Sequence, residues 1–354
     1  RRLDIAPRPL MIFALLSQTM IPWGAMGSGT MLAAAFAHLP GSELGLYSMV
    51  PVSLLMLVWL ALFWRTAREA GLGASARECA HEALWIAAGL ALLAPATAWL
   101  GPESALLATY GPLIVLRYLM DVRPDRRAAW ATARRAWPYI MLIAVLVATR
   151  LLPALKHELQ ALWKIAPFSD LPAWSPFFHA GSWLVAGGVL TALARGQGHG
   201  LAQEARSACK TGRPAILAVF LFAMMAEVLS GAGISRACAQ GMFDALHQEA
   251  VLATPLLASV FGILANSGNA PNSLFMPSQI ALAVQAGLSI PAVAALQHVS
   301  GTSMSLFSPV RMSIAAGLAR GIGQERAVYR TLLPYAVCCL ALLLSGAIGI
   351  VAAK

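Results

Sequence analysis

Charged side chains are scarce in this sequence. Only 11% of the 354 residues are Asp, Glu, Lys or Arg, whereas 59% are hydrophobic. A soluble domain carries roughly 25% charged and 45–50% apolar residues. Because the shortage of charge extends along the whole chain, one apolar core does not account for it. The composition instead indicates that most side chains face lipid or other buried helices, and it excludes an ordinary soluble domain.

Acidic residues are the scarcer of the two charge types, with 15 Asp and Glu against 25 Lys and Arg, which gives a net charge of +10. The arginines gather in short loops between apolar runs, where positive residues mark the cytoplasmic side of a membrane protein. Aromatic and basic residues do not alternate as they do in proteins that bind single-stranded nucleic acid. The excess of positive charge therefore predicts orientation in a membrane and no nucleic-acid partner.

Motifs for metal binding and catalysis are lacking. The five cysteines form no Cys-x-x-Cys pair and have no metal-ligand spacing with histidine, so they are expected to pack as small apolar residues. The chain also has no His-Glu-x-x-His and no Gly-x-Ser-x-Gly motif. We therefore expect no catalytic residues, no metal, no cofactor and no enzymatic activity.

Long apolar segments are what the sequence does contain, and many approach the roughly 20 residues that a membrane-spanning helix needs. They predict an all-α, polytopic membrane protein. Three of them, 8–38, 251–288 and 290–320, are longer than the rest and are interrupted near the middle by Gly, Pro, Asn or Ser. The remaining segments are 42–64, 80–98, 104–120, 137–155, 176–195, 213–232 and 329–352.

The arginine-containing loops fix the expected orientation. Loops 65–79, 121–136 and 196–213 are separated by pairs of spans, so all three can be cytoplasmic, as can the arginines after residue 319. Segments 251–288 and 290–320 must then cross the membrane only once between them. The simplest solution is a re-entrant hairpin at 251–288 followed by a broken helix at 290–320. Irregular backbone at membrane depth is tolerated only where it is buried or lines a wet cavity, so these interruptions indicate a site.

Segment 8–38 is expected to be a second broken helix that runs in the opposite direction. A broken helix in each half, with opposite orientations, is typical of inverted-repeat transporters. The predicted organisation is the end of a first repeat at 1–64, connecting helices at 65–212 and a second repeat at 213–354. A hairpin that matches 251–288 is then expected to precede residue 8 in the complete protein.

The first candidate site is the tip of the proposed hairpin, where Ser267, Asn269 and Asn272 lie among small residues and a proline. Their side chains are suited to cap a short helix that starts near Asn272. The positive end of that helix would face the middle of the membrane, where an anion could dock. In the alternative interpretation, these polar groups only satisfy one another.

The second candidate site is the interruption of segment 290–320. Ser308 before Pro309 is typical of a helix N-cap followed by proline at the first helical position. Arg311 lies nine residues before Arg320, or about 13 Å along a helix. This places Arg311 close to the centre of a hydrocarbon core about 30 Å thick. The guanidinium suits a carboxylate, either that of a substrate or that of a fixed partner such as Glu227.

The third candidate is Glu227, an acidic residue inside an apolar segment. It is predicted to carry the coupled proton. One alternative is an ion pair with Arg311 or Arg236. The other is a solvated position nearer the outer surface. The other predicted substrate-binding side chains lie at the interruptions themselves: Gln18, Thr19 and Ser305.

Several blocks of sequence share the order and spacing of a known family. They are Asn-Ser-Leu-Phe at 272–275 with Gln279, Phe-Ser-Pro at 307–309, Gly-Gln-Glu at 323–325 with Arg330, and Ser-Gln-Thr-Met-Ile-Pro-Trp-Gly-Ala-Met-Gly at 17–27. With these blocks the chain resembles the lactate permeases over nearly its whole length. The resemblance implies proton symport of lactate or related 2-hydroxy monocarboxylates such as glycolate, in a bacterial inner membrane. It also implies further helices and a glycine-rich hairpin on the N-terminal side.

The sequence departs from this family at positions near the expected site. Gly268 stands where the family has an acidic or amide residue, Ser305 replaces a Lys or Asn, and Glu227 and Arg311 occupy positions that are usually uncharged. Transport of another organic or inorganic anion on the same fold is therefore the alternative. A channel or a structural scaffold has less need of charged groups at two broken helices. The expected partners are a small carboxylate, a proton and the lipid bilayer, and a homo-oligomer is left open.

Overall fold

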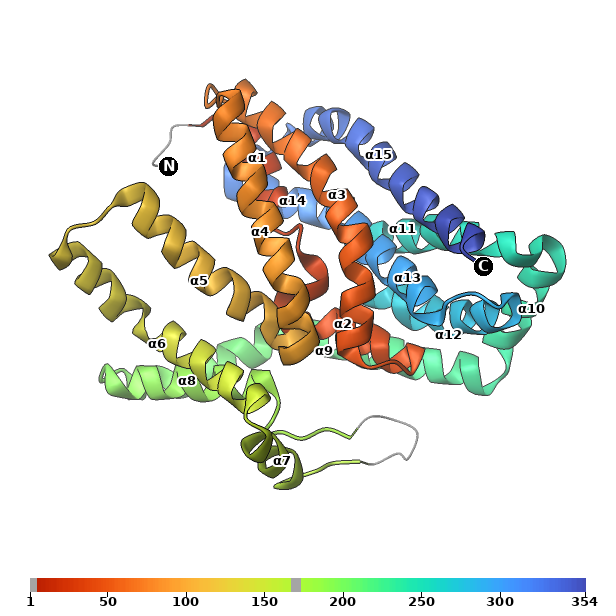
Figure 1. Cartoon of the computed structure of the whole chain (residues 1–354), viewed down its shortest axis with the longest axis horizontal. Helices are drawn as coiled ribbons and strands as arrows, with labels where there is room; N and C mark the ends of the chain where they lie inside the picture. The colour runs from red at the N-terminus through yellow and green to blue at the C-terminus, as the bar shows by residue number, and fades with distance from the viewer. Residues whose placement is uncertain (1–4, 167–172) are drawn as a thin grey trace. The chain divides into compact units, whose positions relative to one another are not determined.

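A computed structural model describes residues 5–166 and 173–354 (Figure 1). Most of the described residues are helical and none forms a β-strand; one isolated bridge joins Ile165 and Trp174. The predicted all-α fold of a polytopic membrane protein is confirmed. Within the described residues, seven segments are long and apolar enough to cross a membrane: Gly41–Glu69, Ala76–Leu100, Pro102–Val122, Arg126–Leu151, Gly198–Gly231, Ile234–Ala265 and Glu325–Ala352.

The chain packs as two units. The first contains residues 1–90 and 221–354, and the second contains residues 91–220. The boundary near residue 90 falls within α4 (Ala76–Leu100) and not in a loop. The division into the end of a first repeat at 1–64, connecting helices at 65–212 and a second repeat at 213–354 remains a prediction.

The first unit begins with α1 (Pro7–Leu16), the short 3₁₀ helix η1 (Ile21–Trp23), α2 (Gly24–Ala37), α3 (Gly41–Glu69) and α4 (Ala76–Leu100) up to residue 90. It continues from residue 221 with the end of α9 (Leu201–Gly231), α10 (Ile234–Leu246), η3 (His247–Leu252), α11 (Ala253–Ala265), α12 (Asn269–Ala286), α13 (Ile290–Met304), η4 (Ser305–Phe307), α14 (Pro309–Ala319) and α15 (Glu325–Ala352).

Helix α13 is the centre of the first unit. Residues 293–308 are all buried, and α13 packs against α3, α11, α12 and α15 (Figure 1). Small residues allow this close approach, as they do between helices in membranes generally. A Cβ atom at Gly262 of α11 would overlap the backbone carbonyl of Gly301 in α13. Only glycine fits at this crossing.

Both predicted broken helices are present. The first is interrupted at residues 17–23 between α1 and α2, and the second at residues 305–308 between α13 and α14. α1 packs against α14, and α2 packs against α12 and α13. The first half of each broken helix thus lies near the second half of the other, as expected for opposite chain directions. A symmetric repeat relation between them remains a prediction.

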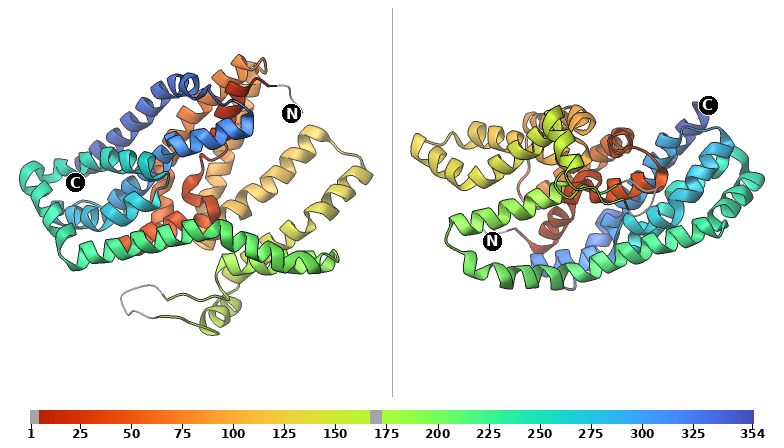
Figure 2. Two further views of the ribbon diagram at one scale, coloured as in Figure 1. Left: turned by 180° about the vertical axis from the view of Figure 1, so that it is seen from behind. Right: turned by 90° about the horizontal axis from the view of Figure 1, so that it is seen from below.

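The predicted hairpin consists of α11 and α12, which pack against each other and against α13 (Figure 2). Asn266 ends α11 in the left-handed conformation, with φ of 53°. Helix α12 starts at Asn269, three residues before the predicted start near Asn272, because the Ser267 hydroxyl accepts from the Asn269 backbone N–H at 3.1 Å. At 1.5 Å per residue, α11 is about 20 Å long, shorter than the membrane core. Re-entry from one side remains a prediction.

The second unit contains the end of α4, α5 (Pro102–Val122), α6 (Arg126–Leu151), α7 (Pro153–Ala161), α8 (Ala180–Ala194), η2 (Gly198–Gly200) and the start of α9. Its helices bury few side chains: of α6 only Leu146, Thr149 and Arg150 are buried. Arg150 forms an ion pair with Glu103 at 3.0 Å and donates to the Phe178 carbonyl at 3.2 Å.

Candidate functional site

The first turn of α14 positions the predicted arginine. Ser308 is the N-cap residue, and its hydroxyl accepts from the Val310 backbone N–H at 3.3 Å, with Pro309 at the first helical position. This start of the helix is the one that the sequence predicts. It holds Arg311 at the N-terminal end of α14, where the helix dipole is positive.

Arg311 joins the three interrupted segments. Its Nε donates to the Asn266 side-chain oxygen at 3.2 Å, at the turn of the hairpin. Its Nη1 donates to the Gln18 side-chain oxygen at 2.5 Å, in the interruption between α1 and α2. The guanidinium of Arg311 therefore connects α14 with two other segments. These are the turn of the hairpin and the interruption between α1 and α2.

Both of these acceptors are neutral amides, so they leave the charge of Arg311 uncompensated. An arginine guanidinium has five N–H donors, and these two bonds use two of them. Among the residues that the structure describes, no carboxylate forms an ion pair with Arg311. Since an arginine within a membrane segment is costly unless paired or hydrated, the arrangement is suited to an anion.

Glu227 lies elsewhere in the first unit. It is exposed on α9, and the structure does not bring it to Arg311 or to Arg236. The ion pairs that the sequence left open are therefore not formed. The solvated position nearer the outer surface and the proton-carrying role of Glu227 both remain predictions.

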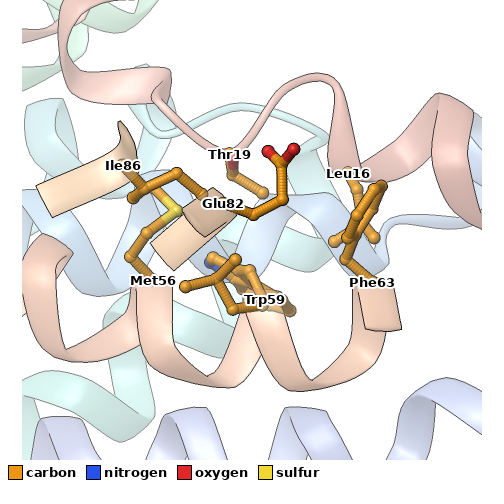
Figure 3. A pocket seen from close by; sticks show the side chains of 8 residues that line it. Leu16, Thr19, Met56, Trp59, Phe63, Glu82 and Ile86 are labelled. Carbon is orange, nitrogen blue, oxygen red and sulfur yellow. The ribbon is translucent and has the colours of Figure 1, made fainter. Parts of the chain in front are cut away.

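A cavity of about 160 Å³ lies beside the first interruption (Figure 3). Such a volume is below the roughly 300–1,000 Å³ of pockets for drug-sized ligands, so it suits a small molecule or ion. Thr19, a predicted substrate-binding residue, lines it together with the apolar side chains of α1, α3 and α4. The Trp59 ring on one wall packs on Phe307 of η4, with ring centroids 5.8 Å apart. The cavity is therefore close to both interruptions.

Glu82 is the acidic residue of this cavity, and it is not among the residues predicted from the sequence. Its carboxylate projects near Thr19 from the first half of α4 (Figure 3), where it is half-buried. A signal for Glu82 exists in the sequence, because it is an acidic residue within an apolar helix. That signal is not sufficient to predict a site residue, because the sequence does not show that Glu82 shares a cavity with residues of α1 and α3.

His298 forms the centre of a buried hydrogen-bond chain. Its Nε2 lies 3.0 Å from the Thr30 hydroxyl of α2, and its Nδ1 lies 2.9 Å from the Asn272 side-chain nitrogen of α12. The Thr30 hydroxyl in turn bonds the Pro22 carbonyl. His298, Asn272 and Thr30 are all fully buried.

The donor and acceptor of each of these hydrogen bonds follow from the protons that Thr30, His298 and Asn272 can donate. The one proton of the Thr30 hydroxyl goes to the Pro22 carbonyl, which can only accept, so Thr30 accepts from Nε2–H of His298. The Nδ1 atom then accepts from the Asn272 amide. This assignment makes His298 neutral, with the proton on Nε2. The Asn272 side-chain nitrogen is thus bonded to His298, while its oxygen has no partner among the described residues, and the substrate contact of Asn272 remains a prediction.

Several polar atoms around α13 have no hydrogen-bond partner in the part of the chain that the structure describes. They are oxygen atoms of fully or nearly fully buried side chains on α11, α12 and α13: Ser259 Oγ, Asn272 Oδ1, Ser273 Oγ, Gln297 Oε1 and Ser300 Oγ. Because an unsatisfied polar atom in a low-dielectric interior costs free energy, the interface of the hairpin with α13 retains capacity to bind water or a polar ligand.

The side chains of the remaining predicted residues contact other parts of the protein. The Ser305 hydroxyl donates to the Thr302 carbonyl at 2.6 Å, and the Ser267 and Ser308 hydroxyls accept from backbone N–H groups. Asn269 faces α2, since a Cβ atom at Gly29 would lie 3.2 Å from its side-chain oxygen. Of the predicted set, the structure therefore brings Gln18 into direct contact with Arg311 and places Thr19 in the neighbouring cavity.

No protein-family model, curated protein or solved structure matches this chain. The fold and the site thus define a class, a polytopic all-α membrane protein with an uncompensated arginine among interrupted helices. The resemblance to lactate permeases depends on the sequence blocks alone.

Proposed function

We propose that this protein is a secondary active transporter that carries a small carboxylate together with a proton. The observation that supports it most is the position of Arg311, a cation held at the meeting of three interrupted segments by two neutral amides. Lactate and related 2-hydroxy monocarboxylates are the proposed substrates, on the resemblance to lactate permeases. Another organic or inorganic anion is the second candidate, supported by Gly268 and Ser305 in place of polar or charged family residues.

In the proposed mechanism the substrate carboxylate accepts hydrogen bonds from the N–H groups of Arg311 that Asn266 and Gln18 leave unused. The positive N-terminal end of α14 adds to the attraction. Binding of the anion neutralises Arg311 and lowers the cost of keeping that charge in the membrane. The hairpin and the broken helices then move as one unit and expose the site to the other side, as in alternating access.

Glu82 and Glu227 are the two candidates for the coupled proton. Glu82 is supported by its position in the cavity beside Thr19, and Glu227 by its position in an apolar helix. Symport of one proton with one monocarboxylate moves no net charge, so a protonatable group near the anion site suits the transport cycle. We further propose a bacterial inner membrane as the location; a homo-oligomer is left open.

The experiment that tests the proposal is uptake of radiolabelled lactate, glycolate and a dicarboxylate into proteoliposomes, with and without an inward proton gradient. We expect uptake of a monocarboxylate above its equilibrium level when the gradient is present. Accumulation of a different anion would support the second candidate. Equilibration without accumulation would indicate a channel and contradict the proposal.

The proton carrier is identified in the same assay by comparing Glu82→Gln with Glu227→Gln. The variant that lacks the carrier is expected to lose gradient-driven uptake while it still exchanges labelled for unlabelled substrate. If both variants accumulate substrate like the unmodified protein, neither carboxylate carries the proton.

A further inference from the structure

The second unit contains a long apolar groove between α6 and α8. It encloses about 440 Å³ and is lined by Trp137, Met141, Leu142 and Val145 of α6 and by residues of α8 that include Gly187 and Leu190. Several of these side chains, such as Trp137 and Leu190, are largely exposed. The groove shares no residue with the site at Arg311, so a ligand bound in it is independent of the proposed function.

Two arginines lie at one end of this groove. The helices run in opposite directions, since Arg150 near the end of α6 donates to the Phe178 carbonyl just before α8, and a Cβ atom at Gly187 would lie 3.9 Å from the Leu142 side chain. Arg134 lies eight residues before Leu142, and Arg195 lies eight residues after Gly187. Because the helices are antiparallel, both arginines lie about 12 Å from the contact of Leu142 with Gly187, toward the same end of the groove. Both also line the groove.

The length of the groove fits one leaflet of a bilayer. The groove extends over 11 residue steps of α6, from Arg134 to Val145, and over 12 of α8, from Trp183 to Arg195. At 1.5 Å per residue, each stretch is roughly 17 Å long. Half of a hydrocarbon core is about 15 Å thick. An acyl chain whose head group lies at the arginines would thus run the length of the groove.

The charge at this end is not neutralised within the chain. Neither Arg134 nor Arg195 forms an ion pair with a residue that the structure describes, and both are exposed. Arg150, near the other end of α6, is instead paired with Glu103. Arg134 and Arg195 also belong to, or adjoin, loops that the positive-inside rule assigns to the cytoplasmic side, where anionic lipids attract basic residues.

We propose that the groove between α6 and α8 binds one anionic phospholipid, with its phosphate between Arg134 and Arg195 and an acyl chain along Leu142 and Gly187. The apolar lining excludes a soluble anion as the occupant, because such a ligand would leave the length of the groove unfilled. The two arginines select a negatively charged head group over a zwitterionic one.

The test is native mass spectrometry of the detergent-purified full chain, titrated with phosphatidylglycerol and, separately, with phosphatidylcholine of the same acyl chains. We expect one tightly bound phosphatidylglycerol and weaker phosphatidylcholine. The double variant Arg134→Ala/Arg195→Ala should weaken phosphatidylglycerol binding on the order of tenfold. Arg127→Ala/Arg135→Ala is the matched control, since it also removes two exposed arginines, neither of which lines the groove, and it should leave binding unchanged.

A second variant tests the acyl chain without changing charge. Gly187→Leu fills the groove and should reduce binding of both lipids, while circular dichroism reports an intact helical fold. Glycerol 3-phosphate, which has the head-group chemistry and no chain, should not displace the lipid. Equal binding of the two lipids, a double variant that binds like the unmodified protein, or displacement by glycerol 3-phosphate would each overturn the proposal.

Discussion

The two units of this protein differ in what their helices bury. In the first unit, 44% of the apolar stretch of α3 is buried, whereas the corresponding share for α6 in the second unit is 6%. The first unit also buries polar side chains around α13, among them Asn272, Gln297 and His298. Because apolar exposure is ordinary in a membrane protein and buried polarity is not, the difference indicates that function is concentrated in the first unit.

The second unit also buries polar groups, among them the ion pair of Arg150 with Glu103, whose side chains are 3% and 16% exposed. Arg150→Ala would leave Glu103 without its charged partner in a largely buried position. We expect a loss of about 3–5 kcal/mol in the free energy of unfolding, measured by titration with SDS. Arg126→Ala, at the exposed start of α6, is the control and should cost little. A small effect of Arg150→Ala would mean that the second unit has no polar core.

Removal of the proposed anion-binding charge is expected to have the next largest effect. Arg311→Ala should reduce substrate uptake at least about thirtyfold, since truncation of one member of a desolvated charge pair costs about 2 kcal/mol or more. Arg311→Lys should retain part of the activity, because it keeps the charge and loses the planar fork. Arg236→Ala is the control, as Arg236 is exposed in the same unit. Normal uptake by Arg311→Ala would contradict the proposed site.

The close crossing of α11 and α13 offers a direct comparison of packing between the units. Gly262→Ala places a methyl group on the Gly301 carbonyl and should destabilise the protein by about 1–3 kcal/mol. Gly188→Ala in α8 meets no atom within 4 Å and should be neutral or stabilising by up to about 1 kcal/mol, because alanine favours helix. Thermal unfolding in detergent measures both. Equal effects would show that the two units are packed alike.

The smallest expected effect concerns the chain of hydrogen bonds at His298. Thr30→Val removes the acceptor for Nε2–H of the buried imidazole and should cost about 1–2 kcal/mol in SDS unfolding. Thr191→Val in α8 is the matched control, since the Thr191 hydroxyl donates only to the Gly187 carbonyl of its own helix. A difference below about 0.5 kcal/mol between the two variants would contradict a stabilising hydrogen bond between Thr30 and His298.

The interruptions were predictable from sequence, and the contacts between them were not. Pro309 after Ser308 and the small residues before Asn269 determine local backbone geometry, so helix starts and breaks depend on nearby residues. The contact of Arg311 with Gln18 joins residues 293 positions apart, and no local pattern encodes such a pairing. For the same reason the sequence does not single out Glu82, because its role depends on the cavity that it shares with Thr19 and with residues of α3.

The burial of α13 also bears on how the protein is made. Its polar residues, among them Gln297 and His298, make it a poor candidate for insertion into lipid alone, so its place in the membrane depends on the helices that surround it. Thr30, which His298 bonds, lies 268 residues earlier in the chain. At roughly 5–20 residues per second, Thr30 is synthesised about 13 to 54 seconds before His298. During that interval the hydroxyl of Thr30 lacks the histidine that completes its network, and ribosome-bound chains that end before α13 would be the natural clients of membrane chaperones.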